Sequence, residues 1–252
     1  MISHLRTVLA FVLLFACSPA VFAENWPCWR GPRGDGTSAE SGVPTEWNET
    51  KNIVWRVEVP GMGHASPIVW EDRIFTVSCL TGSGDRVLFC FDRSTGSRLW
   101  QATVITTPLE KKHTLNSFAS STPATDGRTV YVSFLDNESD DPGVNRGEMI
   151  IAAYDFAGQQ RWLVRPGVFS STHGYCSSPV LFEDMVIVNG DHDGDSYLLA
   201  LEQATGKTKW KVEREHKTRS YCTPIIRSVE GREQLILSGS KTVQAYDPRT
   251  GE

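Results

Sequence analysis

The chain has 252 residues, of which 40% are hydrophobic and 22% are charged. This is the composition of a globular protein with a sizeable core, and it excludes an intrinsically disordered chain and a coiled coil. The formal net charge of −5 leaves no basic surplus to neutralise a phosphate backbone, so we expect no nucleic-acid partner.

Residues 1–23 have the three parts of a secretory signal peptide. Arg6 lies in a positively charged start, residues 7–16 form an apolar run, and Val21 and Ala23 mark a cleavage site for removal of the segment. The run is too short to span a bilayer, and no other stretch has the roughly 18 apolar residues that a transmembrane helix needs. We therefore predict an exported protein in the periplasm, the cell envelope or the medium, without a transmembrane span.

A lipid anchor is the alternative to cleavage after Ala23. The stretch from Leu14 to Cys17 is similar to a lipobox, in which Cys17 would be acylated. Phe15 is bulky for that motif, so we favour cleavage after Ala23.

Five cysteines follow the predicted signal peptide, namely Cys28, Cys79, Cys90, Cys176 and Cys222. An odd number leaves at least one free or intermolecular thiol in an exported chain. Cys79 and Cys90 fall in neighbouring strand-like runs and could pair. The alternative is that they are buried thiols that act as small hydrophobic side chains.

After a lead-in segment over residues 24–52, a repeating pattern extends over residues 53–252. Each unit contains a step of small residues into a proline that is followed by apolar residues, and the four prolines are 56, 56 and 45 residues apart. The four steps are Ala65-Ser66-Pro67, Ser121-Thr122-Pro123, Ser177-Ser178-Pro179 and Cys222-Thr223-Pro224.

Each proline step is followed by further short apolar runs. The second runs cover residues 74–77, 130–134, 186–188 and 235–237, and the third runs end in turns at Gly96, Gly158, Gly206 and Gly251. A tryptophan opens a fourth run four residues after the first three of these glycines, at Trp100, Trp162 and Trp210. The runs are rich in β-branched and aromatic residues, which favours strands. Four strands per repeat predict the blades of an all-β propeller, with the tryptophans filling the wedges between blades.

The blocks that end in Trp100 and Trp210 resemble the tryptophan-docking repeat of PQQ-type quinoprotein β-propellers. That group includes the quinoprotein alcohol dehydrogenases and BamB, the lipoprotein of the outer-membrane assembly machinery. Residues 26–36 and 189–194 resemble blocks of secreted PQQ-like repeat proteins. The resemblance covers about residues 26–252, and it implies a β-propeller of four-stranded blades with tryptophan-docking repeats.

The number of blades leaves two alternatives. Residues 53–57, which include a fourth docking tryptophan at Trp55, are strand-like but have no blade before them, and the fourth unit stops one residue after Gly251. Either these four blades belong to a ring of seven or eight blades, as the resemblance implies, or a four-bladed ring is closed by the strand of Trp55. We favour the first alternative.

Polar and aromatic residues precede the first strands of the blades, which line the axis of a propeller. They predict a ligand-binding cup at one mouth of the channel, formed by His64, Asn116, His173, Tyr175, Arg219 and Tyr221. The alternative is that each side chain satisfies backbone groups of its own loop. The histidines are irregularly spaced, so we predict no metal site, and no motif predicts a catalytic residue.

Residues 191–195 are superficially similar to a calcium-binding loop. Their glycine is at the fourth position instead of the sixth, so the loop cannot wrap a cation in that way. We interpret them as a tight hairpin turn between a second and a third strand.

Two functions follow from this sequence. The favoured one is an exported, non-catalytic propeller that binds proteins or envelope components and needs no cofactor. The alternative, implied by the resemblance, is a quinoprotein alcohol or sugar dehydrogenase that uses PQQ with calcium. We favour the first because no set of carboxylates and amides in this sequence matches a calcium site beside a quinone.

Overall fold

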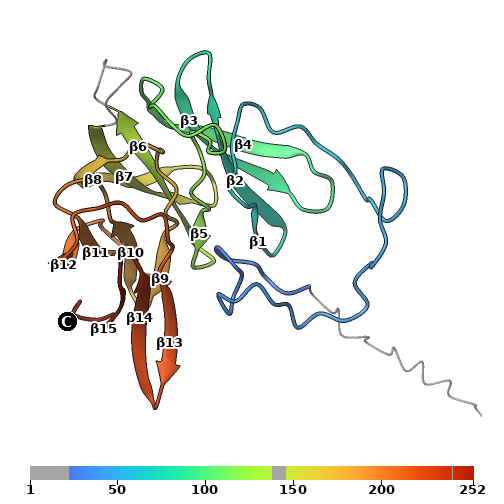
Figure 1. Cartoon of the computed structure of the whole chain (residues 1–252). Helices are drawn as coiled ribbons and strands as arrows, with labels where there is room; N and C mark the ends of the chain where they lie inside the picture. Colours follow the sequence, from blue (N-terminus) through green and yellow to red (C-terminus); the bar gives the residue numbers. More distant parts are fainter. Residues whose placement is uncertain (1–22, 138–145, 240) are drawn as a thin grey trace, which may run out of the picture.

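The computed structural model describes residues 23–137, 146–239 and 241–252, which form strands β1–β15 in four antiparallel sheets (Figure 1). The prediction of an all-β fold is confirmed. No helix in the described ranges is both long enough and apolar enough to cross a membrane. The predicted signal peptide, apart from Ala23, and the alternative lipid anchor at Cys17 lie outside the described residues.

Consecutive strands pair in chain order, so each repeat of the sequence becomes one sheet. The first sheet contains β1 (Ile68–Trp70), β2 (Arg73–Leu80), β3 (Asp85–Asp92) and β4 (Arg98–Thr106). The second contains β5 (Ala124–Thr125), β6 (Thr129–Asn137), β7 (Arg146–Asp155) and β8 (Gln160–Ser170). The third contains β9 (Val180–Phe182), β10 (Met185–Gly190), β11 (Tyr197–Glu202) and β12 (Thr208–Glu213). The fourth has three strands, β13 (Ile225–Val229), β14 (Arg232–Ser238) and β15 (Val243–Tyr246).

Residues 53–57 do not form the predicted strand. They lie outside β1–β15, and the sheet of β13–β15 is not completed by them. No described strand runs beside this segment to accept its backbone hydrogen bonds. The described residues therefore do not form the four-bladed ring closed by the strand of Trp55.

The hydrophobic core lies between the sheets, and β6 shows how alternation builds it. Val132 and Phe134 pack into a cluster shared with the first sheet, whereas Tyr131 and Leu135 pack into a cluster shared with the third sheet. Successive side chains of a strand point to opposite faces, so a strand buried on both faces joins two cores. A third cluster connects the sheet of β9–β12 with that of β13–β15. Each sheet is therefore stabilised by its neighbours along the chain.

Four tryptophans connect each unit with the turn of the next. Each indole Nε1–H donates a hydrogen bond to a backbone carbonyl of that turn, over 2.8 to 3.1 Å. The pairs are Trp55 with Arg93, Trp100 with Phe156, Trp162 with Gln203 and Trp210 with Pro248. Each ring lies against the turn glycine, where an added Cβ would come within 2.6 to 2.9 Å of a ring atom. These glycines also have positive φ. The turn therefore needs glycine both for its backbone conformation and for the space that the indole ring occupies.

We expect Trp162→Ala to lower the free energy of unfolding by roughly 3 to 5 kcal/mol, the usual cost of removing a large buried aromatic side chain. Trp162 is 9% exposed and packs between two sheets. Trp47→Ala is the matched control, because Trp47 is 68% exposed, and its change should stay within about 0.5 kcal/mol. Urea unfolding followed by circular dichroism measures both. Equal stability of the two variants would show that the inter-sheet tryptophan contributes nothing.

Candidate functional site

The four proline steps meet through a ladder of hydroxyl groups. The backbone N–H of Ser66 donates to Thr122 Oγ1 over 3.0 Å, that of Thr122 to Ser178 Oγ over 3.0 Å, and that of Ser178 to Thr223 Oγ1 over 3.2 Å. Each rung joins one unit to the next just before its first strand. The small hydroxyl residues of the repeat therefore satisfy backbone donors where four chain segments come together.

Beside this ladder lies a hollow of about 510 Å³ that receives residues from every unit. His64 and Ser120 come from the loops before β1 and β5, and two further loops contribute Cys176, Ser178, Tyr221, Cys222 and Thr223. Trp29 and Arg30 of the lead-in segment complete the wall. None of the residues that line this hollow in the described chain is Asp or Glu. We refer to it as the axial hollow.

Four of the six predicted ligand-binding residues lie in or near this region. His64 and Tyr221 line the axial hollow. The His173 ring lies 6.0 Å from the Tyr221 ring, centroid to centroid, and 5.6 Å from the ring of His113. Asn116 Nδ2 donates to the His173 backbone carbonyl over 2.7 Å. Asn116, His173 and Tyr221 therefore form one cluster from three different units, beside the hollow that Tyr221 shares with His64.

Tyr175 has a different position from the predicted one. It is 4% exposed and belongs to the core between the second and third sheets, where its hydroxyl donates to Ser133 Oγ over 3.0 Å. Burial raises the pKa of Tyr175. Tyr175 is not among the residues that line the axial hollow, and its contacts anchor the loop in the core.

Arg219 is also not part of the wall. Its guanidinium lies 2.7 Å from the carboxylate of Asp193 in a pair of which each side chain is about one third exposed. Its charge is therefore balanced at the surface. Arg30, which the sequence did not indicate, is the one cationic side chain among the described residues that line the axial hollow.

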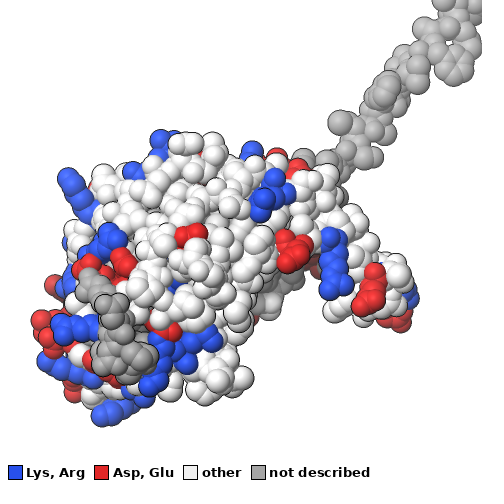
Figure 2. Space-filling view, turned by 90° about the horizontal axis from the view of Figure 1, so that it is seen from above, with Lys and Arg blue, Asp and Glu red and all other residues white. Residues whose placement is uncertain are grey.

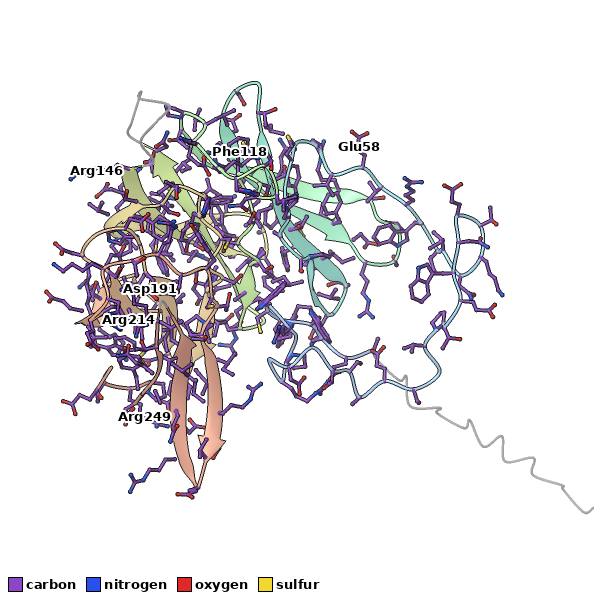
Figure 3. All side chains as sticks on the ribbon, viewed as in Figure 1. Glu58, Phe118, Arg146, Asp191, Arg214 and Arg249 are labelled. Carbon is purple, nitrogen blue, oxygen red and sulfur yellow. The ribbon has the colours of Figure 1, made fainter. Side chains whose placement is uncertain are left out.

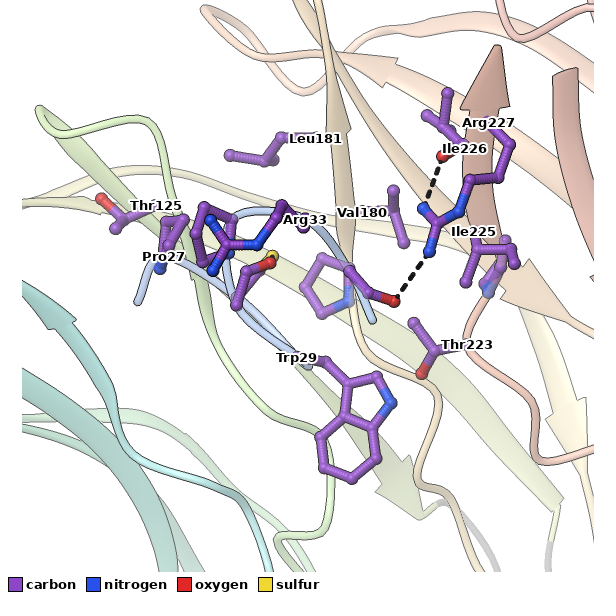
Figure 4. A pocket seen from close by; sticks show the side chains of 16 residues that line it. Pro27, Trp29, Arg33, Thr125, Val180, Leu181, Thr223, Ile225, Ile226 and Arg227 are labelled. Carbon is purple, nitrogen blue, oxygen red and sulfur yellow. Dashed lines mark hydrogen bonds between the residues drawn. The ribbon is translucent and has the colours of Figure 1, made fainter. Parts of the chain in front are cut away.

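The lead-in segment is the part of the site that sequence reasoning missed. Trp26 pairs its backbone with Val69 of β1, and the backbone N–H of Thr125 donates to the Pro27 carbonyl over 2.9 Å. Arg227 of β13 donates to the Gly34 carbonyl over 3.2 Å (Figure 4). The segment thus contacts the first strands of three units. Its Pro and Gly residues restrict or permit particular backbone angles, and this composition was the sequence feature that could have indicated a fixed path.

A second hollow, of about 250 Å³, is lined by residues of the lead-in segment and of the first strands (Figure 4). Val180, Leu181, Ile225 and Ile226 give it an apolar wall. Trp29 lines both hollows. Thr223 and Ile225 also line both, so the two hollows are neighbours that share one wall.

The turn after β10 is joined to the end of β12 by a buried ion pair. Residues 191–196 connect β10 and β11, so the predicted hairpin turn is confirmed. Arg214 Nε lies 2.8 Å from Asp191 Oδ1, and their side chains are 3% and 2% exposed (Figure 3). Ser220 Oγ donates to Asp191 Oδ2 over 2.7 Å. This network fixes the loop that leads to Tyr221, and only the fold could reveal it, since Asp191 and Arg214 are far apart in sequence.

Charged side chains elsewhere are interspersed. Figure 2 shows basic and acidic groups side by side on one face, with wide areas that carry neither. A second buried pair joins Arg86 and Glu110 at 2.5 Å, and burial raises the pKa of Glu110. Among the ion pairs of the described residues, these two are the ones in which both side chains are almost fully buried.

We expect Arg214→Met to lower the free energy of unfolding by about 3 to 5 kcal/mol, because Asp191 would remain as a buried charge without a counter-charge. Lys217→Ala is the control: its pair with Asp195 is 68% and 87% exposed and should contribute about 0 to 1 kcal/mol. Thermal and urea unfolding measure both. The double variant Arg214→Met, Asp191→Leu should recover much of the loss. A cost for Arg214→Met no larger than that for Lys217→Ala would contradict the role of the buried pair.

Several solved structures are similar to this chain. The quinohemoprotein alcohol dehydrogenase from Comamonas testosteroni is 17% identical with a TM-score of 0.50, over 75% of this chain and 27% of that chain. BamB from Moraxella catarrhalis is 17% identical with a TM-score of 0.49, over 79% and 53%. A europium-containing methanol dehydrogenase is 14% identical with a TM-score of 0.45, over 63% and 26%. The chain thus spans about a quarter of the length of the two dehydrogenases and about half of that of BamB. At such sequence identities the similarity concerns the fold alone.

No curated protein matches the chain in sequence. A sequence profile described as "Outer membrane protein assembly factor BamB" matches residues 37–162 and 123–252. Because the two matches together extend over most of the sequence, the chain belongs to this BamB-type family of PQQ-like β-propeller repeat proteins.

Proposed function

We propose that this chain is an exported, non-catalytic β-propeller that acts as a binding or scaffold module in the cell envelope. The observation that carries the proposal is the axial hollow, which four units and the lead-in segment line without a carboxylate. Its aromatic, hydroxyl and thiol groups offer contacts to a bound molecule. General acid–base chemistry at this position would have to use His64 or Tyr221, because no Asp or Glu lines the hollow among the described residues.

The partners that we propose are proteins or other envelope components. The family description names an outer membrane protein assembly factor, and the predicted signal peptide or lipid anchor would bring the chain to the same compartment. Tyr221 lines the hollow, and the His173 ring lies beside it, with the two ring centroids 6.0 Å apart. Aromatic side chains of this kind are enriched at protein interfaces.

The residues of the axial hollow do not fit PQQ with calcium. Calcium takes six to eight oxygen ligands, mostly carboxylates and carbonyls, and no Asp or Glu lines the hollow among the described residues. Nowhere in the described ranges do three or more His, Cys, Asp or Glu side chains form a group that could hold a metal ion. An anionic quinone would find one guanidinium, that of Arg30.

We expect no binding of PQQ at micromolar concentration in the presence of Ca²⁺, and no dye-coupled oxidation of alcohols or sugars. Isothermal titration calorimetry on the full-length protein measures the first, and a dye-reduction assay measures the second. A stoichiometric heat that His64→Ala or Arg30→Ala abolishes would overturn the proposal. Arg249→Ala, in a surface ion pair remote from the hollow, is the matched control.

A photo-crosslinking side chain at Tyr221 should capture a defined envelope protein in the source cells, because Tyr221 lines the axial hollow. The same group at Val229, which is 41% exposed at the end of β13, is the control and should not capture that protein. Mass spectrometry identifies the products. Equal capture at both positions, or none at Tyr221, would contradict binding at the hollow.

A further inference from the structure

Residues 176–178 and 221–223 run side by side in a fixed register. The Cys176 thiol lies 3.7 Å from the Tyr221 carbonyl oxygen, Ser177 Oγ donates to the Cys222 carbonyl over 3.3 Å, and the Ser178 N–H donates to Thr223 Oγ1 over 3.2 Å. These three contacts join consecutive residues of one segment to consecutive residues of the other. The Cys176 sulfur is thereby held next to the peptide bond that precedes Cys222.

Both thiols line the axial hollow, and both are free. Cys176 is half-buried and Cys222 is exposed. Their backbones are anchored, since Asn189 Nδ2 also donates to the Cys222 carbonyl over 3.0 Å and the neighbouring Tyr175 is packed in the core. The two cysteines therefore line one hollow, on backbone segments that are held by hydrogen bonds and core packing.

We propose that Cys176 and Cys222 form a disulfide that links the neighbouring segments of the third and fourth units. A disulfide-bearing oxidant such as oxidised glutathione supplies the chemistry. One protein thiolate attacks the oxidant and releases one glutathione thiol, and the second protein thiol then displaces the second glutathione from the mixed disulfide. The protein loses two electrons and two protons, and two glutathione thiols are formed.

The other cysteines have no such partner among the described residues. Cys79 and Cys90 are fully buried on β2 and β3, where they face Arg86 and Phe75 and not each other, so the possible pair raised from the sequence does not form. The Cys28 thiol donates to the Gly31 carbonyl over 3.3 Å within the lead-in segment. Burial also raises the pKa of Cys176 to about 11 and raises that of Cys222. Thiols of high pKa do not stabilise a reduced pair as thiolate, which favours the disulfide once it has formed.

The test is peptide mapping of the folded, full-length protein after equilibration in a buffer rich in oxidised glutathione. Acid quenching and alkylation with N-ethylmaleimide precede digestion by trypsin, which places Cys176 in residues 162–207 and Cys222 in residues 220–227. We expect these two peptides to be recovered as one linked species, which reduction separates. The melting temperature of the oxidised protein should exceed that of the reduced protein by several degrees.

Three variants make the result decisive. Cys222→Ser and Cys176→Ser should each leave the remaining cysteine as a glutathione adduct and remove the dependence of melting temperature on redox state. Cys28→Ser is the matched control and should retain the linked peptides. Because a serine replaces a thiol of nearly equal size, and neither cysteine is fully buried, these variants should fold. Glutathione adducts on both cysteines of the parent protein without a link, or a link from Cys28 to either, would overturn the proposal.

Discussion

The contact between a tryptophan and the glycine turn of the following unit determines how the sheets are placed. A four-stranded sheet cannot bury both faces by itself, so it must be held at a fixed distance from its neighbours. The indole of Trp100 supplies that distance by packing on Gly158 and donating to the Phe156 carbonyl over 2.9 Å. The turn accepts the ring because its glycine has no Cβ. The cores between sheets and the approach of the first strands both follow from this spacing.

Close approach at the axis creates both the ladder and the hollow. Four chain segments arrive side by side, and their backbone N–H groups need acceptors that small hydroxyl residues such as Thr122 and Ser178 provide. Small side chains leave space beside the ladder, and this space becomes the axial hollow. The lead-in segment, fixed on β1, β5 and β13, contributes Trp29 to this hollow and to the smaller one next to it. The hollow thus follows from the packing constraints of the fold.

Electrostatics stabilises the loops around the hollow and not its interior. The carboxylate of Asp191 is neutralised by Arg214 in a nearly solvent-free position, and such a pair is favourable only when further hydrogen bonds compensate for lost hydration. Ser220 supplies one of these bonds. These contacts hold the segment that leads to Tyr221 and Cys222, and they pair the carboxylate of Asp191 outside the hollow. Charged groups thus stabilise the surrounding loops, while the described lining of the hollow keeps the carboxylate-free character on which the proposed binding role rests.

The sequence by itself determined the all-β class, the repeat and the residues that form each turn. These features are local: alternating apolar residues, a proline step and a Thr-Gly turn decide the strand and its end within a few residues. Only the tertiary structure decided that Tyr175 is a core residue and that Arg219 is paired with Asp193. It also decided that Arg30 and Trp29 line the site and that Cys176 meets the segment of Cys222. Such relations depend on which distant segments become neighbours, and that is set by the angle and spacing of whole sheets, which no local pattern encodes.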